Sequence, residues 1–487
     1  MTFKDNEGAD YKVNTGNVPK ARIYFSPRIG FNWDVKGNRM TQVRGGTGLF
    51  LSRIPYVLIS NQLGNNGVNS ATVQGSNTVN FPFTLDPSRY NPTDSKKLTG
   101  YQVNASDEDL KFPQVWKSNI GIDQQLGWGV IATVEGIFNK NYNALRYIDV
   151  NLKPATAEFA GTDSRDRFPA SGLSGQAATT ARLINGDVSN VYVLTNTNKG
   201  YSYSITGKLE KAATRGFGGM IGYTYGQAKD IASVSSTVEG NVPGINGLNN
   251  LDLAWSGNDL RHRFVGYVSY RKEYGGKIGG ATMITLGGVS NSGTKLSYIS
   301  STDMNGDGQN NDLLYVPKSA SEINFVTSTT TVNGKTYTFS PEQQAAAFQS
   351  YIDSHPYLSK RKGQYTERNG GAYPWLTRFD LTVEQDFYVK VGAKDKKNII
   401  RLRADVFNIG NMINNKWGVG NQVTVSSNST QSTPLNFASV SADGVPSYRM
   451  GTQVIAGETV LVRDAFVKGR TINDVWQAQI GIRYIFN

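Results

Sequence analysis

The stretch Trp476-Gln477-Ala478-Gln479-Ile480-Gly481-Ile482-Arg483-Tyr484-Ile485-Phe486 alternates between two kinds of residue. Its even-numbered positions are all apolar, whereas most of its odd-numbered positions carry glutamine, glycine or arginine. Alternate residues of a β-strand point to opposite faces, so the stretch predicts a strand with one apolar face. That face begins and ends with aromatic rings and has aliphatic residues between them, which is typical of a strand that crosses a bilayer. The alternative is the last strand of a soluble β-sandwich.

The composition of the 487-residue chain fits membrane strands and not membrane helices. Only 38% of the residues are hydrophobic, although the chain contains 53 Gly, 25 Tyr and 21 Phe. No uninterrupted apolar run approaches the roughly 18 residues that a spanning helix needs, which excludes helical spans. Barrel strands are not excluded, because only their alternate residues face lipid.

The chain contains no Cys and has a formal net charge of +12, and both facts limit the sites and partners that it can have. Without Cys, the chain has no disulfide and no thiolate. A basic protein can bind nucleic acid, but the Lys and Arg residues are scattered and form no dense tract. We therefore expect no nucleic-acid partner, and we place the cations on a polar inner face, in outer loops and in short turns.

Alternating segments recur along the chain in pairs, and a short turn joins the two members of each pair. The predicted pairs are 22–35 with 41–51, 112–122 with 128–138, 201–209 with 217–225, 264–270 with 282–286, and 375–387 with 400–406, followed by the final strand. Between the pairs lie long polar stretches at about 52–111, 141–200, 230–260, 291–373 and 410–474. Short turns at one end and long loops at the other predict an all-β, antiparallel transmembrane barrel with extracellular loops.

The number and direction of the predicted strands suggest that the barrel is larger than this chain. There are about eleven strands, whereas complete bacterial barrels have an even number. If the last strand ends in the periplasm, the first strand runs inward and the region around Met1 lies outside the cell. The first residues also lack the apolar segment of a signal peptide. We expect the chain to be the C-terminal part, about half, of a larger barrel.

Several segments resemble one family of barrels. The sequences Ser26-Pro27-Arg28-Ile29-Gly30-Phe31-Asn32-Trp33-Asp34, Val43-Arg44-Gly45-Gly46-Thr47-Gly48-Leu49-Phe50, Asp259-Leu260-Arg261-His262-Arg263-Phe264 and Leu402-Arg403-Ala404-Asp405-Val406-Phe407-Asn408 resemble TonB-dependent outer-membrane receptors. Asp303-Met304-Asn305-Gly306-Asp307-Gly308, followed by Asn311-Asp312-Leu313-Leu314-Tyr315-Val316-Pro317, resembles the Oar-like branch, which carries a carboxypeptidase-regulatory-like domain before the plug. The resemblance covers nearly the whole chain.

The resemblance implies a plugged barrel of about 22 strands in the outer membrane, of which this chain would be the C-terminal portion without a plug domain. It implies energised uptake of a large or scarce ligand, with the TonB system acting through N-terminal regions that this chain lacks. The implied partners are outer-membrane lipid, lipopolysaccharide, the outer-membrane assembly machinery and an unknown ligand, for which no binding residue is assigned. The residues expected to close the barrel and signal its assembly are Trp476, Ile480, Ile482, Tyr484 and Phe486. The alternatives are a barrel-anchored adhesion or interaction protein and a passive porin.

One acidic loop is a candidate metal site. Asp303, Asn305 and Asp307 alternate before Gly308, as in the first half of a calcium loop, and Asp312 supplies a late carboxylate. The twelfth position is Leu314, where a calcium loop has a bidentate Glu. The alternative is a loop whose Asn and Asp side chains make local turns. Calcium is thus the one cofactor that the sequence suggests.

The remaining motifs predict structure and not catalysis. The two His residues, His262 and His355, lack partners at suitable spacing, and no pair of carboxylates has a supporting framework, so we expect no enzyme activity. Ser340-Pro341-Glu342 predicts the start of a short helix that reaches Ile352 in the longest loop. The loop residues Tyr357, Tyr365 and Tyr373 are candidates either for contact with carbohydrate or peptide or for packing the loops together.

Overall fold

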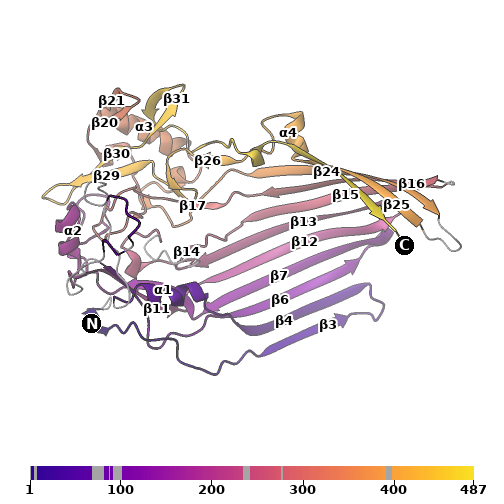
Figure 1. The fold of residues 1–487 in the computed structure, drawn as a ribbon, viewed down its shortest axis with the longest axis horizontal. Coiled ribbons are helices and arrows are strands. Elements are labelled where there is room, and N and C mark those ends of the chain that lie inside the picture. Colours follow the sequence, from indigo (N-terminus) through magenta and orange to yellow (C-terminus); the bar gives the residue numbers. More distant parts are fainter. Residues whose placement is uncertain are drawn as a thin grey trace.

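One large antiparallel sheet dominates the computed structural model, which describes residues 2–4, 8–67, 82–86, 88–90, 101–233, 242–275, 278–390 and 397–486 (Figure 1). Eleven of its twelve strands follow one another in the order of the sequence, and the short β14 (Ala254–Trp255) pairs with β13 off this path. The eleven are β3 (Arg28–Asp34), β4 (Thr41–Leu51), β6 (Gln114–Gln125), β7 (Val130–Tyr142), β12 (Tyr201–Thr214), β13 (Phe217–Asp230), β15 (His262–Tyr274), β16 (Ile278–Asn291), β24 (Leu376–Lys390), β25 (Lys397–Phe407) and β34 (Gln477–Ile485). The prediction of an antiparallel, all-β fold from these segments is confirmed.

The register of the sheet brings the apolar residues of neighbouring strands into rows. Val268 of β15 pairs with Leu286 of β16, which pairs with Leu381 of β24, and Leu381 pairs with Val406 of β25. Val406 in turn pairs with Ala478 of β34. We call the side of the sheet that carries this row the apolar face and the opposite side the polar face. Directly opposed apolar side chains of this kind are expected where a sheet faces lipid.

Ion pairs of Arg and carboxylate side chains occupy the polar face. Asp386 of β24 accepts hydrogen bonds from Arg401 at 2.6 and 3.0 Å and from Arg271 at 3.1 Å. On β4, Arg44 binds Asp123 at 2.9 Å and Glu135 at 2.8 Å. These charges alternate in sequence with the apolar row, so the two faces are separated by the strand period alone.

Two strand boundaries differ from the prediction. The segment 22–35 was expected to form one strand, but β3 begins only at Arg28. Pro27, just before it, has no N–H to donate and contributes only its carbonyl, which accepts from Leu49 N at 3.0 Å. Trp128, expected on the strand that returns after Gly127, lies in the turn itself with a φ of 61° and is 91% exposed. Short turns are also expected at 274–277 and 392–396, and residues 276, 277 and 392–396 lie outside the described part of the chain.

The strands β3 and β34 lie at the two ends of the order, and no strand pair joins them in the part of the chain that the structure describes. Both are exposed along almost their whole length. Among the described residues, no helix has the length and apolar character needed to cross a membrane.

The long connections gather at one end of the sheet, opposite the short turns, as Figure 1 shows. They were expected to be polar loops, but they contain folded elements of their own. The N-terminal segment before β3 contributes β1 (Thr2–Lys4) and β2 (Asp10–Lys12). The first connection contributes α1 (Tyr56–Gly64) and β5 (Tyr101–Ser106). The second contributes β8 (Ala144–Asp149), β9 (Ala157–Glu158), β10 (Asp166–Arg167), α2 (Gly175–Arg182) and β11 (Val188–Thr197). The fourth contributes β17 (Lys295–Tyr298), β18 (Tyr315–Val316), β19 (Asn324–Phe325), β20 (Ser328–Val332), β21 (Lys335–Phe339), α3 (Pro341–Ser354), β22 (Gln364–Tyr365) and β23 (Gly371–Ala372). The fifth contributes α4 (Ile409–Ile413), β26 (Asn421–Val423), β27 (Ser426–Asn428), β28 (Gln431–Ser432), β29 (Leu435–Val440), β30 (Pro446–Met450), β31 (Thr452–Ile455), β32 (Glu458–Leu461) and β33 (Phe466–Lys468).

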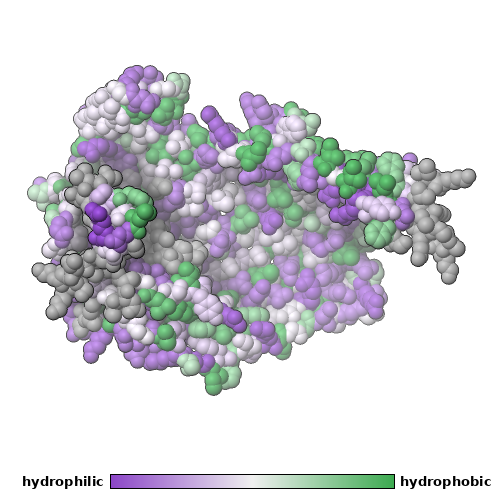
Figure 2. Space-filling view, viewed as in Figure 1, coloured by the Kyte–Doolittle hydropathy of each residue, from purple (hydrophilic) through white to green (hydrophobic). Residues whose placement is uncertain are grey.

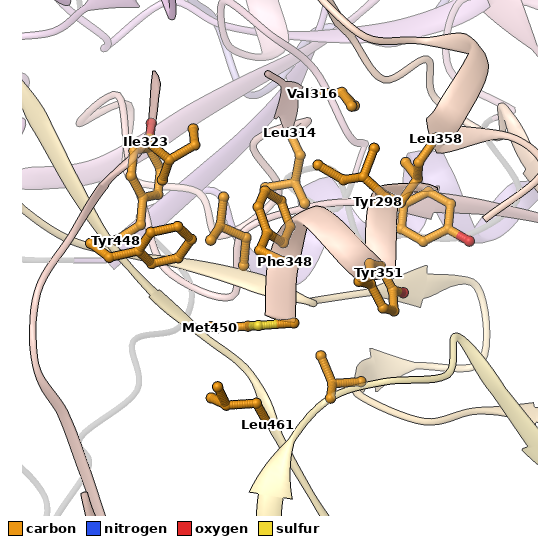
Figure 3. Packing of buried hydrophobic residues seen from close by; sticks show 14 of the residues in the cluster. Tyr298, Leu314, Val316, Ile323, Phe348, Tyr351, Leu358, Tyr448, Met450 and Leu461 are labelled. Carbon is orange, nitrogen blue, oxygen red and sulfur yellow. The ribbon is translucent and has the colours of Figure 1, made fainter. Parts of the chain in front are cut away.

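These elements form a loop cap with hydrophobic cores that are separate from the apolar face. The largest core surrounds α3, where Phe348 and Tyr351 meet residues of the fourth and fifth connections (Figure 3). The predicted helix is confirmed, and its start has a full capping box in which Ser340 accepts from Gln343 N. Of the three loop tyrosines, Tyr357 stacks on Tyr298, Tyr365 packs edge-on against Tyr315, and Tyr373 packs on Phe466. Packing of the loops is therefore one role of these rings.

The apolar face makes a first prediction. Ile480 lies between the aromatic residues Trp476 and Tyr484 on β34 and is 82% exposed. Replacing it with Arg should lower the free energy of unfolding in phospholipid vesicles by about 2–4 kcal/mol, because the charge then sits near the middle of the lipid. The control is Gln479→Arg, on the polar face, which should cost much less. Equal losses for the two variants would contradict the assignment of the faces.

The core of the loop cap makes a second prediction. Phe348→Ala should destabilise the cap by about 3–5 kcal/mol, because it leaves a cavity among fully buried side chains. Hydrogen exchange should then become faster in α3 while the amides of β15 and β16 stay protected. Val454→Ala, at an exposed position of β31, should change neither. Loss of protection in the large sheet after Phe348→Ala would show that the cap and sheet are not separate cores.

Candidate ligand-binding site

A pocket of about 970 Å³ lies where the loop ends of the strands meet the loop cap. Two strand ends fix its position, because Asn291 is the last residue of β16 and pairs with Leu376, the first residue of β24. Both residues belong to the polar face by the strand period. Beyond these ends the third, fourth and fifth connections form the walls, and Figure 2 shows the molecule hollowed beside the cap. The pocket thus opens on the polar side of the sheet and not toward the apolar face.

A small four-stranded sheet, in the order β23-β17-β28-β27, holds one wall of the pocket. The chain between β16 and β17 can pass close to the backbone of Tyr373 because position 293 is glycine. A Cβ atom on Gly293 would lie 2.0 Å from the carbonyl oxygen of Tyr373. Tyr373 N donates to the Thr294 carbonyl at 3.0 Å, and the Tyr373 hydroxyl donates to the Ser429 carbonyl at 2.6 Å. The Tyr373 ring is therefore a fixed part of the wall.

Eleven Ser, Thr, Asn and Gln residues of the lining carry a side-chain hydroxyl or amide, although apolar atoms make up most of the exposed surface of the pocket. These residues are Ser233, Asn291, Ser292, Thr294, Ser297, Asn369, Asn421, Asn428, Ser429, Thr430 and Gln431. The apolar lining comes from Ala232, Val242, Pro243, Leu248, Leu260, Pro374 and Leu376, and no Asp or Glu among the described residues lines the pocket. A pocket of this size with a few polar groups beside apolar ones is typical of a small-molecule binding site.

The two cationic side chains in the pocket wall, Lys295 and Arg368, each pair with a carboxylate that lies behind the wall. Lys295 Nζ lies 3.0 Å from Asp259 Oδ2, and the side chain of Lys295 is 9% exposed. Arg368 donates to Asp230 Oδ1 at 2.8 Å and also to the Asp230 carbonyl. Both pairs are largely buried, so each lining cation already has a carboxylate partner. Asp259 is shared with Arg261, which lies 3.2 Å from it.

Sequence reasoning did not identify these residues. They come from strand ends and from three connections that are far apart in the sequence, and the polar character of each is ordinary for a loop. The signal that was available is Tyr373, which the sequence singled out as an aromatic loop residue and which the structure places in the pocket wall.

The structure brings the residues of the acidic loop together, but it gives their oxygens local partners. Asp303 accepts from Gly306 N at 2.7 Å and from Gly308 N at 2.8 Å. Asn305 accepts from Asp307 N at 2.9 Å, and Asp307 accepts from Gln309 N at 2.8 Å. These are the local turns that were the alternative to a metal site.

The fourth residue of this loop, Asp312, faces a buried arginine. It accepts from Met304 N at 2.8 Å, and its other oxygen lies 3.5 Å from Arg165, which also pairs with Asp163 at 2.9 Å. Burial raises the pKa of Asp312 to about 7, although Arg165 acts in the opposite direction. Burial and the neighbouring carboxylates likewise raise the pKa of Asp307 well above its ordinary value. Among the described residues no group of three or more His, Cys, Asp or Glu is arranged to hold a metal ion.

The residues predicted to close the barrel share one exposed face. Trp476, Ile480, Ile482, Tyr484 and Phe486 all have exposed side chains on the apolar face, and Tyr484 stacks on Phe486. Their role as an assembly signal stays a prediction. His262 lies at the loop end of β15, where Tyr223 binds its Nδ1 at 2.8 Å and Trp375 stacks on its ring. His355 is buried in the cap next to Tyr298, and burial lowers its pKa to about 4.

A family model agrees with this architecture. It is described as "Outer membrane beta barrel domain" and matches residues 2–448. No curated protein is significantly similar in sequence. Among solved structures, the chain is similar to the outer membrane transporter YddB from Escherichia coli, with 10% identity and a TM-score of 0.40 over 94% of this chain and 40% of that chain. It is also similar to the siderophore receptor PirA from Acinetobacter baumannii, with 12% identity and a TM-score of 0.33 over 87% of this chain and 40% of that one.

A third structure, a mutant of the ferric enterobactin receptor PfeA from Pseudomonas aeruginosa, matches with 10% identity and a TM-score of 0.34 over 87% of this chain and 38% of that chain. The chain thus spans about two fifths of the length of these solved structures.

The acidic loop makes a third prediction. If Asp303, Asn305, Asp307 and Asp312 bind calcium, titration calorimetry with calcium chloride should show saturable heat in the millimolar range, about the strength of extracellular calcium modules. The variant Asp303→Asn/Asp307→Asn keeps the side-chain volumes and should give no such heat. The same heat for both proteins, or none for the unchanged protein, would leave only the loop held by local turns.

Proposed function

Because this chain belongs to the family of outer membrane beta barrel domains, we propose that it is the barrel portion of a TonB-dependent receptor that takes up a large or scarce ligand. The protein lies in the outer membrane, so the long loops are at the cell surface and the short turns are in the periplasm. The Oar-like branch is proposed from the sequence of the acidic loop around Asp303 and the segment that follows it.

The observation that carries the proposal is the pocket between the loop cap and the polar face. A receptor must hold its ligand on the outer side, in a position from which the ligand can pass along the inside of the barrel. This pocket lies at the surface end of β16 and β24 and on the polar face, which is the inside of a membrane barrel. A loop cap with its own hydrophobic cores keeps the walls of such a site in place.

We also propose that the eleven strands are the second half of a larger barrel built around a plug. This proposal is supported by the outer edges of β3 and β34, which are not paired with each other in the described residues. An unpaired strand edge leaves backbone N–H and C=O groups without partners, which is costly in lipid. Further strands between these two edges would satisfy those groups.

The test uses the protein produced from its own gene, purified in detergent. A receptor of this class should bind the isolated periplasmic domain of TonB, because uptake depends on that contact. It should also show no steady conductance in a planar bilayer, because a plug blocks the barrel. A general porin, which should conduct ions continuously, serves as the positive control for conductance.

Two outcomes would overturn the proposal. Continuous conductance without TonB binding would indicate a passive porin. Neither conductance nor TonB binding, together with attachment of cells to a surface that is lost on deletion of the gene, would indicate a barrel-anchored adhesion protein.

A further inference from the structure

The chemistry of the pocket indicates what kind of ligand it takes. We propose that the pocket binds an uncharged, polyhydroxylated ligand, namely a segment of a neutral oligosaccharide. The inference rests on the proposed receptor function and adds the class of substrate to it. It is carried by three features of the lining: the number of amide and hydroxyl side chains, the pairing of its cations with carboxylates, and one buried acceptor that has no partner among the described residues.

The amide and hydroxyl side chains match the hydrogen-bonding groups of a sugar. Each hydroxyl of a sugar both donates and accepts, and the side chains of Asn, Gln, Ser and Thr also supply both functions. Thr294 and the loop residues Asn428, Ser429 and Thr430 are exposed toward solvent in the pocket wall. Leu260, Leu376 and Pro374 provide apolar contact for the C–H faces of a sugar ring.

The charges in the wall argue against an anionic ligand. Lys295 and Arg368 are paired with Asp259 and Asp230, and the described residues of the lining include no carboxylate that a cationic ligand would pair with. An anion would have to draw one of these cations away from a buried carboxylate and leave that carboxylate unpaired. A neutral ligand makes no such demand.

The unpaired acceptor is Asn291 Oδ1, at the loop end of β16. It is buried, and the described residues provide no hydrogen-bond donor within reach of it. Buried acceptors are nearly always paired, so this exception in a pocket wall leaves an acceptor to which a ligand hydroxyl donates once the Asn291 side chain rotates into the pocket. A site built around hydroxyl recognition of this kind rejects analogues that lack the hydroxyl.

A peptide fits these observations less well. An extended peptide is usually recognised by its backbone, which adds to the free edge of a sheet. The strand that enters the pocket, β17, is paired on one side with β23 and on the other with β28, so it offers no edge. The groups that remain available are side chains, which suits a ligand with many hydroxyls.

The test applies the purified, fluorescently labelled protein to an array that carries neutral oligosaccharides, acidic oligosaccharides and peptides. We expect binding to at least one neutral oligosaccharide, and Asn291→Leu should lower the affinity for it at least ten-fold. Leucine has the same number and branching of side-chain heavy atoms as asparagine, although it is larger, and it removes the unpaired acceptor, so the variant should still fold. Asn421→Ala, in the part of the wall formed by β26, is a second variant that should weaken binding.

The matched control is Asn119→Leu. Asn119 lies on the polar face of β6, outside the pocket lining, and its substitution should leave the affinity unchanged. Binding to acidic oligosaccharides or peptides only, no binding at all, or full affinity in both pocket variants would overturn the inference. TonB binding without glycan binding would overturn this inference alone, whereas glycan binding without TonB binding would overturn only the proposed uptake.

Discussion

The pairing of backbone groups in lipid is the constraint on which the rest of this structure depends. The hydrocarbon part of a membrane contains no water, so every backbone N–H and C=O there needs a partner within the protein. The eleven strands meet this need by pairing in sequence order. Pairing in turn fixes the direction of the side chains, so that alternate residues must be suited to two different solvents. The row from Val268 to Ala478 and the ion pairs around Asp386 are the two results of this single requirement.

The position of the pocket follows from the same constraint. Polar groups are unfavourable in the middle of the apolar face, so amides and hydroxyls gather mainly on the polar face, near the strand ends or beyond them. Asn291 and Leu376 stand where these two regions meet, since they pair with each other at the loop ends of their strands. Residues further along the loops are free of the strand period and can be chosen for packing or for contact with a ligand.

The sequence predicted the sheet well and the loop cap poorly, for physical reasons. A strand such as β34 repeats its pattern every two residues, and the pattern is visible without knowledge of its neighbours. The core of the cap has no such period, because Leu296, Phe348 and Leu435 come from three distant segments and meet only in the folded state. The helix α3 was an exception, since its capping box is local. The acidic loop could not be assigned from its sequence, because alternating Asp and Asn residues are found both in local turns and in metal sites.

The parallel pairings in the cap have a consequence for the order of folding. β17 pairs in parallel with β28, and β19 pairs in parallel with β30, although more than a hundred residues separate the partners in each case. Contacts between such distant segments form slowly, because a long loop must close before they gain any free energy. The hairpins that those segments connect, β15 with β16 and β24 with β25, involve neighbours in sequence and close sooner. The chain should therefore become a membrane protein before it becomes a binding protein, and a newly inserted molecule would pass some time at the cell surface with its recognition site unformed.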